Sequence, residues 1–552
     1  QSLIRKGHRE HAMTAVGAAG ERGETIGVLD KRHIIAREGF NRWLVPPAAL
    51  AIHLCIGMAY GFSVFWLPLS RAIGIDRSVE CAGMGIGQAL FTTTCDWRIA
   101  DLGWMYTLFF VLLGISAATW GGWLERAGPR KAGVVSAVCW CGGLLISALG
   151  VIYHQLWMLW LGSGVIGGIG LGLGYISPVS TLIKWFPDRR GMATGMAIMG
   201  FGGGGVIGAP LANILMNQFR TETSVGVWQT FVAMAAIYFV FMLAGAFGYR
   251  LPPTGWKPEG WTPRASKPLV ATRHVHLSHA HKVQQFWLIW GVLCLNVSAG
   301  IGVIGIASPM LQEIFGASLI GRPDVPFTAL EQTQATMVAT IAAGFTGLLS
   351  LFNIGGRFFW ASLSDIIGRK ATYYTFFLLG IVLYASAPWL AHSGSVALFV
   401  LAFGIILSMY GGGFATIPAY LADIFGTHFV GAIHGRLLTA WSTAGIVGPV
   451  VVNYIRQAQI DAGVPREQVY DFTLYILAGM LALGFLCNLG VKPLAQRWFM
   501  SDEQVAELQV AHTPPPADTT SLGAARGGTM VALAWLAVGI PIAWGVWVTL
   551  QT

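Results

Sequence analysis

Residues 120–130 read Trp-Gly-Gly-Trp-Leu-Glu-Arg-Ala-Gly-Pro-Arg, and residues 360–370 read Trp-Ala-Ser-Leu-Ser-Asp-Ile-Ile-Gly-Arg-Lys. In both stretches an acidic residue stands three positions before a glycine and five positions before a base. The same offset of 240 positions relates ten pairs of residues: Trp120 and Trp360, Glu125 and Asp365, Gly128 and Gly368, Arg130 and Lys370, Gly172 and Gly412, Pro178 and Pro418, Gly191 and Gly431, Gly195 and Gly435, Gly205 and Gly445, and Gly208 and Gly448. Agreement in one register predicts an internal duplication of two homologous halves, with a substrate path between them.

The composition is that of a membrane protein. Of the 552 residues, 55% are hydrophobic and 11% are charged, whereas soluble proteins carry about 25% charged residues. Six apolar runs of about 20 residues fall in each half, and each is long enough to cross a bilayer as a helix. These runs are 43–69, 103–124, 132–152, 156–184, 190–217 and 228–249, then 285–314, 334–362, 371–391, 395–424, 431–455 and 471–491.

We therefore expect an all-α integral membrane protein of two six-helix bundles, plus a thirteenth, C-terminal transmembrane helix from about Thr529 to Leu550. The expected divisions are a basic cytoplasmic tail (1–42), a first bundle (43–249, with an outer loop at 70–102), a central loop (250–283), a second bundle (284–491), a polar linker (492–528) and the extra helix (529–552).

The positive charges indicate topology. With the N-terminus inside, 26 of the 34 Lys and Arg lie in cytoplasmic segments, as the positive-inside rule requires. The net charge of +9 is therefore explained without a nucleic-acid partner. We expect a multi-pass protein of the bacterial plasma membrane, with a cytoplasmic N-terminus, that functions as a monomer.

The repeated loops and a glycine pattern resemble a known family. Residues 122–131 and 364–370 are similar to the loop signature of the major facilitator superfamily, and Gly200, Gly204, Gly208 and Pro210 are similar to its second motif. Within it, residues 353–365 and 431–441 resemble the oxalate:formate antiporter family, which neighbours the monocarboxylate transporters. The resemblance covers about residues 43–491 and implies the twelve-helix fold and transport by alternating access. The thirteenth helix is similar to a small subunit found beside or fused to some such carriers.

Arg357 is the residue from which we predict a substrate. It stands eight positions before Asp365, or about 12 Å along a helix, which places it near the middle of the bilayer. An arginine there costs about 2.5–3.5 kcal/mol, so it should face a cavity or a partner. We find no acid in the cores of the twelve apolar runs, since Asp423 stands at the cytoplasmic end of its run. The guanidinium is therefore expected to bind a carboxylate, with Asn353 one turn away as a second donor. The alternative is a structural arginine bonded to carbonyl groups.

At one position this sequence differs from the resembling family, and the difference favours small substrates with a single negative charge. In the oxalate carriers of that family, a lysine of helix 11 joins the helix-8 arginine to hold a dianion, and the matching position here is Trp441. One cation balances a monoanion but leaves a dianion partly uncompensated. We therefore expect formate, lactate or pyruvate before oxalate.

Aromatic residues in five helices are candidates for lining the site: Tyr60, Tyr106, Tyr175, Tyr410 and Trp441. Ordinary packing is an equal alternative for any one ring. His53, regarded as the only histidine within a helix core, is a candidate for proton coupling, although a packed histidine is the more common case. Monocarboxylate symporters often carry an Asp where this chain has Asn353. A proton-coupled lactate or pyruvate symporter therefore stays open as the alternative to exchange.

The loop charges are expected to latch the two bundles in one conformational state. The candidates are Glu125, Arg126, Arg130, Lys131, Asp365, Arg369 and Lys370. The alternative is that they only anchor topology. Neither an embedded enzyme nor a transporter-like sensor is favoured, since we find no nucleophile, metal or paired acid at depth and no segment large enough for an output domain.

Two further groups of residues stay open. His274, His276, His279 and His281 cluster in the central loop, where we favour a solvated linker over a metal site. Cys81 and Cys95 share the first outer loop and could close a disulfide in an oxidising compartment. We expect no metal and no cofactor.

Overall fold

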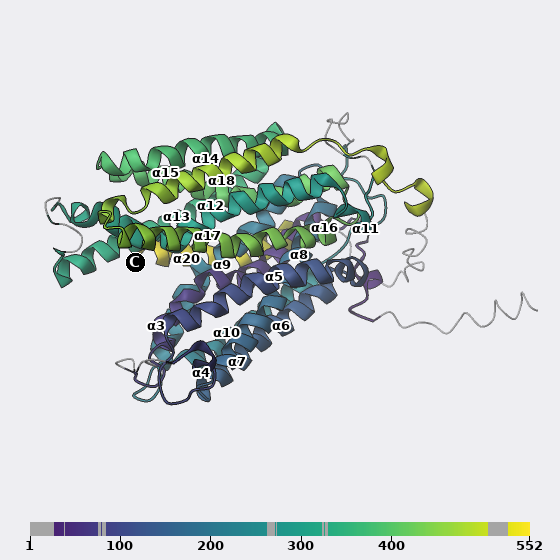
Figure 1. Cartoon of the computed structure of the whole chain (residues 1–552). Coiled ribbons are helices and arrows are strands. Elements are labelled where there is room, and N and C mark those ends of the chain that lie inside the picture. Colours follow the sequence, from purple (N-terminus) through teal and green to yellow (C-terminus); the bar gives the residue numbers. More distant parts are fainter. Residues whose placement is uncertain are drawn as a thin grey trace, which may run out of the picture.

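The computed structural model describes residues 27–37, 39–75, 79, 84–261, 271, 273–322, 325, 329–505 and 528–551, and within these ranges all regular elements are helices (Figure 1). Cys81 lies outside them. The helices of the first half are α2 (Val45–Ile56), α3 (Trp66–Leu69), α5 (Ile99–Ala127), α6 (Pro129–Ile152), α7 (Leu156–Leu159), α8 (Gly168–Trp185), α9 (Arg190–Phe219) and α10 (Val227–Gly248). The 3₁₀ segment η3 (Gly57–Phe65) joins α2 to α3, and the π segment η4 (Trp160–Gly167) joins α7 to α8.

The second half repeats this order. Its helices are α12 (Gln284–Phe315), α13 (Gln332–Ile367), α14 (Arg369–His392), α15 (Val396–Phe425), α16 (Val430–Leu437) with α17 (Thr439–Asp461), and α18 (Asp471–Gly490), followed by the separate helix α20 (Gly528–Gln551). The short helices η1 (Lys31–Ile34), α4 (Ile86–Ala89) and α11 (Leu277–Ala280) lie outside the spans, whereas η2 (Arg42–Leu44) forms the start of the first one. Thirteen predicted apolar runs thus correspond to thirteen helical segments of the described chain.

Twelve helices of the described residues are long and apolar enough to cross a membrane, and α20 is one of them. The long helix α13 is not in this set, but it packs lengthwise against α9 and α15, which are. The chain therefore has the predicted architecture of an all-helical membrane protein, in which α13 takes its place among the spanning helices.

Glycines end the two helices that carry the repeated loops. Gly128 has φ 88° and Gly368 has φ 92°, a conformation that side-chain-bearing residues rarely adopt. Pro129 then occupies the first turn of α6, where its missing N–H costs nothing. The chain therefore reverses sharply at equivalent points of the two halves.

The halves meet along two seams, formed by α9 with α13 and by α5 with α16. Small residues permit the close approach. A Cβ on Gly195 would lie 2.8 Å from the carbonyl oxygen of Arg357, and a Cβ on Gly435 would collide with that of Ala117. Ala117 and Arg357 are also separated by 240 positions, so the two seams are equivalent. Figure 1 shows the two groups of helices diverging from the end that carries α11 and α16. We call this end, which also carries the repeated loops, the basic end.

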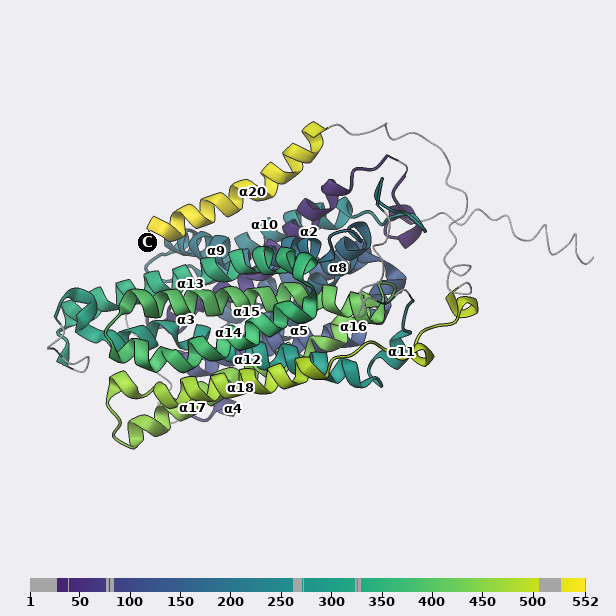
Figure 2. The same ribbon diagram turned by 90° about the horizontal axis from the view of Figure 1, so that it is seen from above.

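The extra helix packs on the first half. Trp535 of α20 donates a hydrogen bond to the Trp43 carbonyl at 3.2 Å, and a Cβ on Gly545 would lie 2.9 Å from the Val206 carbonyl oxygen. Val538 is buried in a cluster with Leu50 and Ala51, whereas Leu536 and Ile540 are exposed. Figure 2 shows α20 along the outside of the molecule beside α9. The helix is therefore an addition to the two-half core.

The outer loop at 70–102 contacts the first half, where His154 Nε2 lies 2.8 Å from the Cys95 carbonyl oxygen, and it is also held by bonds of its own. The Asp96 carboxylate accepts backbone N–H groups of Ile73, Gly74 and Val79 at 2.7–3.0 Å. Cys95 is disulfide-bonded, and the other described cysteines, Cys55, Cys139, Cys141, Cys294 and Cys487, are free. The pairing of Cys95 with Cys81 stays a prediction, because Cys81 is not among the described residues.

Candidate functional site

The Arg357 side chain is fully buried where the two halves meet. Its Nε donates to Asn353 Oδ1 at 3.0 Å, and its Nη1 donates to the Ile198 carbonyl of the other half at 3.1 Å. Its Nη2 has no hydrogen-bond partner, and no carboxylate of the described chain pairs with it. The guanidinium thus keeps a free donor and a charge without a fixed counterion.

Two glycines make room for this arginine. A Cβ on Gly202 of α9 would lie 3.0 Å from Arg357 Nε, and a Cβ on Gly411 of α15 would lie 3.1 Å from Arg357 Cγ and 2.5 Å from Asn353 Oδ1. The same glycine pattern also permits close helix packing, because a Cβ on Gly204 would lie 2.5 Å from the Cα of Gly57 in η3. The glycine run therefore serves packing on one face and the arginine on another.

Trp441 lies at the centre of an aromatic cluster built from both halves, and it is fully buried. Its ring centroid lies 5.4 Å from that of Tyr175 and 6.4 Å from that of Tyr60. The remaining rings around it, which the sequence did not single out, are Phe110 at 5.3 Å, Phe201 at 5.5 Å and Phe414 at 4.4 Å. The Arg357 Cζ atom lies 5.8 Å from the centre of the Tyr60 ring and 5.7 Å from that of Phe414, which joins the cation to the cluster.

Several polar atoms of this cluster are buried without a hydrogen-bond partner in the described structure. They are the hydroxyl groups of Tyr60, Tyr175 and Tyr410, Trp441 Nε1, Arg357 Nη2 and both ring nitrogens of His434. A buried polar group left unsatisfied costs about 1–3 kcal/mol, so such a concentration requires either water or a polar ligand. The site therefore has donors placed for an anion.

The structure separates the remaining tyrosine candidates by position. Tyr410 lies beside Phe414, with ring centroids 5.3 Å apart, and interacts electrostatically with Tyr60 and Arg357. Tyr106 is half-buried and contacts Phe110, at the edge of the cluster. Tyr410 therefore belongs to the arginine side of the site, and Tyr106 is peripheral to it.

Two histidines, rather than one, lie within helix cores at this site. His53 is fully buried, with Nδ1 2.5 Å from the Ala197 carbonyl oxygen and Nε2 3.1 Å from that of Tyr175. His434 of α16 is also buried, and its ring lies 5.8 Å from the Tyr175 ring. The expectation that His53 was the only such histidine is wrong. His434 lies four positions after the start of α16 and two positions before Arg436, so the sequence alone places it at a helix end rather than in a helix core.

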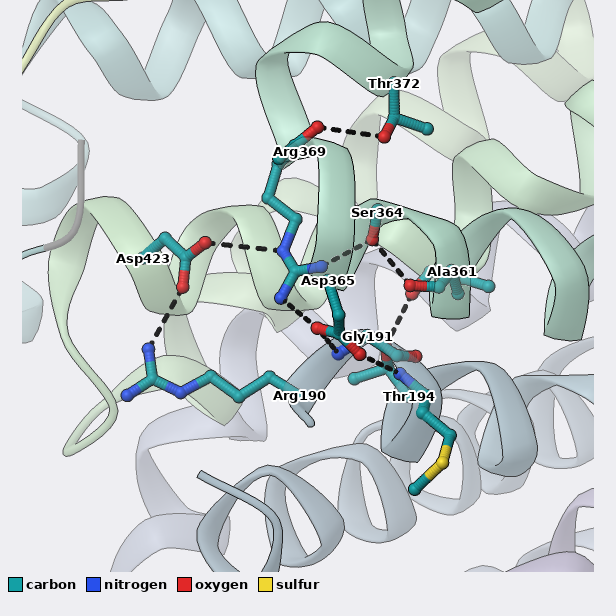
Figure 3. A network of polar contacts seen from close by, with 12 residues as sticks. Arg190, Gly191, Thr194, Ala361, Ser364, Asp365, Arg369, Thr372 and Asp423 are labelled. Atoms are coloured by element: carbon teal, nitrogen blue, oxygen red, sulfur yellow. Dashed lines mark hydrogen bonds and ion pairs between the residues drawn. The ribbon is translucent and has the colours of Figure 1, made fainter. Parts of the chain in front are cut away.

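The basic end of the α9–α13 seam is held by Asp365 (Figure 3). Its two carboxylate oxygens accept the backbone N–H groups of Gly191 and Met192, each at 2.9 Å, in the first turn of α9 in the other half. Arg369 pairs with Asp365 at 2.5 Å. An anion at a helix N-terminus is favoured by the helix dipole as well as by the hydrogen bonds. This acid therefore ties the second half to the first.

A second acid strengthens the same seam. Asp423 of α15 pairs with Arg369 of its own half at 3.3 Å and with Arg190 of the first half at 3.1 Å (Figure 3). Deeper in the seam, the Thr194 hydroxyl donates to the Ala415 carbonyl at 2.7 Å. The Asp423–Arg190 pair and the Thr194–Ala415 bond therefore join the two halves at successive depths of the seam.

The α5–α16 seam repeats the arrangement with the equivalent residues. Glu125 Oε1 accepts the backbone N–H of Gly431 in the first turn of α16 at 3.2 Å, while Lys184 and Ser180 of its own half hold the carboxylate at 2.7 and 3.0 Å. Further in, Ser442 donates to the Phe110 carbonyl at 2.6 Å. Acids at equivalent positions therefore contact helix N-termini in opposite halves.

The bases of the repeated loops behave differently. Arg130 donates to the carbonyls of Val28, Phe247 and Tyr249, all in the first half, and Lys370 contacts the carbonyls at the end of α18. Arg126 is exposed. The expected latch role is therefore not met for Arg130, because its contacts anchor α6 to α10 and the tail within one half.

The central loop docks at the basic end next to the seams. The Val275 N–H donates to the Phe425 carbonyl, and Arg436 Nη1 lies 2.9 Å from His281 Nδ1. Burial and then the Lys184 charge lower the pKa of His428, in the turn before α16, to about 4; burial also lowers the pKa of His274. Within the described residues, His, Cys, Asp and Glu form no group of three that could hold a metal.

A comparison with protein families matches residues 88–449 to the model of the Major Facilitator Superfamily. The chain belongs to this superfamily. It is 25% identical over 410 residues to the oxalate:formate antiporter of Oxalobacter formigenes, which covers 74% of this chain and 83% of that protein. It is 23% identical over 467 residues to the apicoplast pyruvate carrier 1 of Toxoplasma gondii, covering 72% of this chain and 81% of that one.

Solved structures show the same fold. The fucose:proton symporter of E. coli matches with a TM-score of 0.54 at 12% identity, over 82% of this chain and 100% of that chain. The two identified relatives and this structural neighbour are transport proteins by their names, so the chain is a major facilitator superfamily transporter.

Proposed function

We propose that this transporter carries small carboxylate anions across the membrane by alternating access, with monocarboxylates favoured over dicarboxylates. The observation that carries the proposal is the fully buried Arg357, which lies between the halves with a free Nη2 and no carboxylate partner in the described chain. A buried guanidinium without a counterion is stabilised most by a carboxylate, which neutralises its charge and can accept two parallel hydrogen bonds from it.

The surroundings of the arginine support a small ligand. Rings from both halves pack around Trp441 at 4.4–6.4 Å, so a bound molecule would be enclosed by aromatic surfaces and by the free hydroxyl groups of Tyr60 and Tyr410. Since Trp441 occupies the position where the oxalate carriers of the resembling family have a lysine, one permanent cation remains. That single charge matches a monocarboxylate.

The absence of a fixed counterion also indicates exchange. A buried, unpaired cation is costly, so the halves should rearrange more easily when the anion is present than when the site is empty. The names of the relatives are consistent with this class of cargo, because one is an oxalate:formate antiporter and another a pyruvate carrier. We propose that the basic end faces the cytoplasm of a bacterial cell and is closed in this conformation.

The test is uptake into liposomes that contain the purified protein and are loaded with formate, oxalate, lactate or pyruvate, with and without a pH gradient. Labelled monocarboxylate should exchange with internal carboxylate in the wild type and stop in Arg357→Gln. The control is Arg436→Gln, because Arg436 contacts the central loop rather than the site and its loss should leave exchange in place. Unchanged exchange in a folded Arg357→Gln protein would contradict the proposal.

A further inference from the structure

The imidazole of His53 is placed between two hydrogen-bond acceptors. Its Nδ1 lies 2.5 Å from the carbonyl oxygen of Ala197 in α9, and its Nε2 lies 3.1 Å from that of Tyr175 in α8. A neutral imidazole has one N–H group and one lone pair, so either tautomer directs a lone pair at a carbonyl oxygen. Only the imidazolium, with two N–H groups, satisfies both contacts.

His434 offers the opposite arrangement in the same cluster. It is equally buried, but neither of its ring nitrogens has a hydrogen-bond partner among the described residues. Protonation would leave it with two buried N–H groups and no acceptor, which is unfavourable. Of the two buried histidines, His53 is therefore the one whose surroundings accept a proton.

The charges that face His53 are few. It stacks on Tyr175 of α8 with ring centroids 5.3 Å apart, and it interacts electrostatically with Arg357 of α13 and with His434 of α16. From α10, Tyr238 interacts with Cys55 rather than with His53, and from η2, Arg42 is paired with Asp188 at the basic end. The helices α9 and α20 present only apolar or backbone groups to this part of α2. A proton on His53 would therefore place a second positive charge beside Arg357, and the contacts of the described residues include no acid that would neutralise it.

Charge balance then sets a rule for the ligand. With neutral His53, a monoanion bound at Arg357 gives a neutral site; with protonated His53, a dianion does. Each neutral combination avoids the cost of a net buried charge. We propose that His53 is a proton-binding site that supplies the second positive charge for a short dicarboxylate, so that the carrier binds a dianion together with one proton and a monoanion without one.

The inference rests on the proposed function of Arg357, and it adds the ion that accompanies the cargo. The proton comes from water on the side where the anion enters, forms an N–H bond on the imidazole, and leaves to water on the other side. Exchange of a dianion plus a proton for a monoanion then moves no net charge across the membrane. His53 acts through its charge across the site, since both of its nitrogens are already directed at carbonyl groups.

The test measures protons taken up on binding by the full chain in detergent, in weakly buffered solution with a pH indicator, using formate and oxalate as probes. Oxalate should take up close to one proton per molecule bound, and formate close to none. The apparent Kd for oxalate should rise by up to tenfold per pH unit wherever His53 has lost its proton, while that for formate stays constant.

Variants make the assignment specific. His53→Gln should abolish proton uptake with oxalate and weaken oxalate binding by at least tenfold, and it should leave formate binding within twofold. His154→Gln is the control, because it removes another buried imidazole, which lies 2.8 Å from the Cys95 carbonyl oxygen away from the site, and it should keep the proton uptake. The wild-type measurement needs no variant, so oxalate binding without proton uptake would overturn the inference even if His53→Gln fails to fold.

The outcomes are separable. Oxalate binding without proton uptake, no oxalate binding at any pH while formate binds, or unchanged uptake in His53→Gln would each overturn the inference. If neither formate nor oxalate binds the wild type, or both bind Arg357→Gln as tightly as the wild type, the proposed function itself fails.

Discussion

Replacing Asp365 with asparagine should open the basic end of the transporter. In the structure the carboxylate accepts two backbone N–H groups of α9 at 2.9 Å, and these contacts join opposite halves. An amide has one acceptor oxygen, so one N–H loses its partner and the other keeps a neutral bond. The pair with Arg369 does not count toward closure, because both residues lie at the same end of the second half and stay together when the seam parts.

The magnitude follows from the lost interactions. A hydrogen bond to a charged group contributes about 1.5–3 kcal/mol, and the carboxylate also gains about 0.3–1 kcal/mol from the helix N-terminus. Because the Asp365 side chain is 18% exposed, we take the lower part of that sum, about 1.5–3 kcal/mol. The ratio of closed to open basic ends should therefore fall by about ten- to a hundredfold.

The assay is the distance distribution between spin labels placed at Arg126 and Ile366, which are exposed at the basic end of opposite halves. Asp365→Asn should lengthen the distribution, and transport kinetics should change with it. The control is Asp188→Asn, which breaks the 2.6 Å pair with Arg42 inside the first half and should leave the distance unchanged. If Asp365→Asn behaves like Asp188→Asn, the latch role assigned to Asp365 is wrong.

Three further predictions concern packing, pH and covalent structure. Gly411→Ala should destabilise the protein by about 1–3 kcal/mol, because the new Cβ collides with Asn353 of α13. The control is Gly355→Ala on α13, whose Cβ meets nothing within 4 Å, and equal melting temperatures of the two variants would contradict this. The pKa of His428 is lowered to about 4 in the closed form, whereas a free histidine has a pKa of about 6.5. The open form therefore takes up a proton first, so closure should be fully stable above about pH 7 and weaken as the pH falls toward 4. The spin-label distances should lose this pH dependence in His428→Gln. Mass spectrometry of the intact chain should show a gain of two hydrogens on reduction, with Cys81 and Cys95 as the newly labelled thiols, and labelling of both without reductant would rule out the bond.

The repeat made much of the fold predictable. Because the offset of 240 positions places Glu125 and Asp365 at equivalent helix ends, the sequence indicated two similar halves and acids at the ends of α5 and α13. The apolar runs gave helix limits within a few residues, since a helix that crosses a bilayer needs about 20 apolar residues. Arg357 was identifiable because a charge within such a run is rare.

The contacts across the seams were not predictable in the same way. Asp365 and Arg130 belong to similar loop patterns, yet the acid reaches the opposite half and the base stays within its own, which depends on where α9 and α10 end in space. Phe414 lies 4.4 Å from Trp441 but is separated from it by 27 positions in the chain, so periodicity alone could not pair them. Their meeting is set by the packing of α15 against α16, which leads directly into α17.

The most direct test of the central claim is equilibrium binding of a labelled monocarboxylate, formate or pyruvate, to purified wild type, Arg357→Lys and Arg357→Gln, with the folded state of each checked by its melting temperature. We predict that Arg357→Gln weakens binding by about ten- to a hundredfold, as expected for loss of a charge-assisted bond of about 1.5–3 kcal/mol, and that Arg357→Lys is intermediate because it keeps the charge but not the paired donors. A folded Arg357→Gln protein with the wild-type Kd would contradict the claim that this guanidinium binds the cargo.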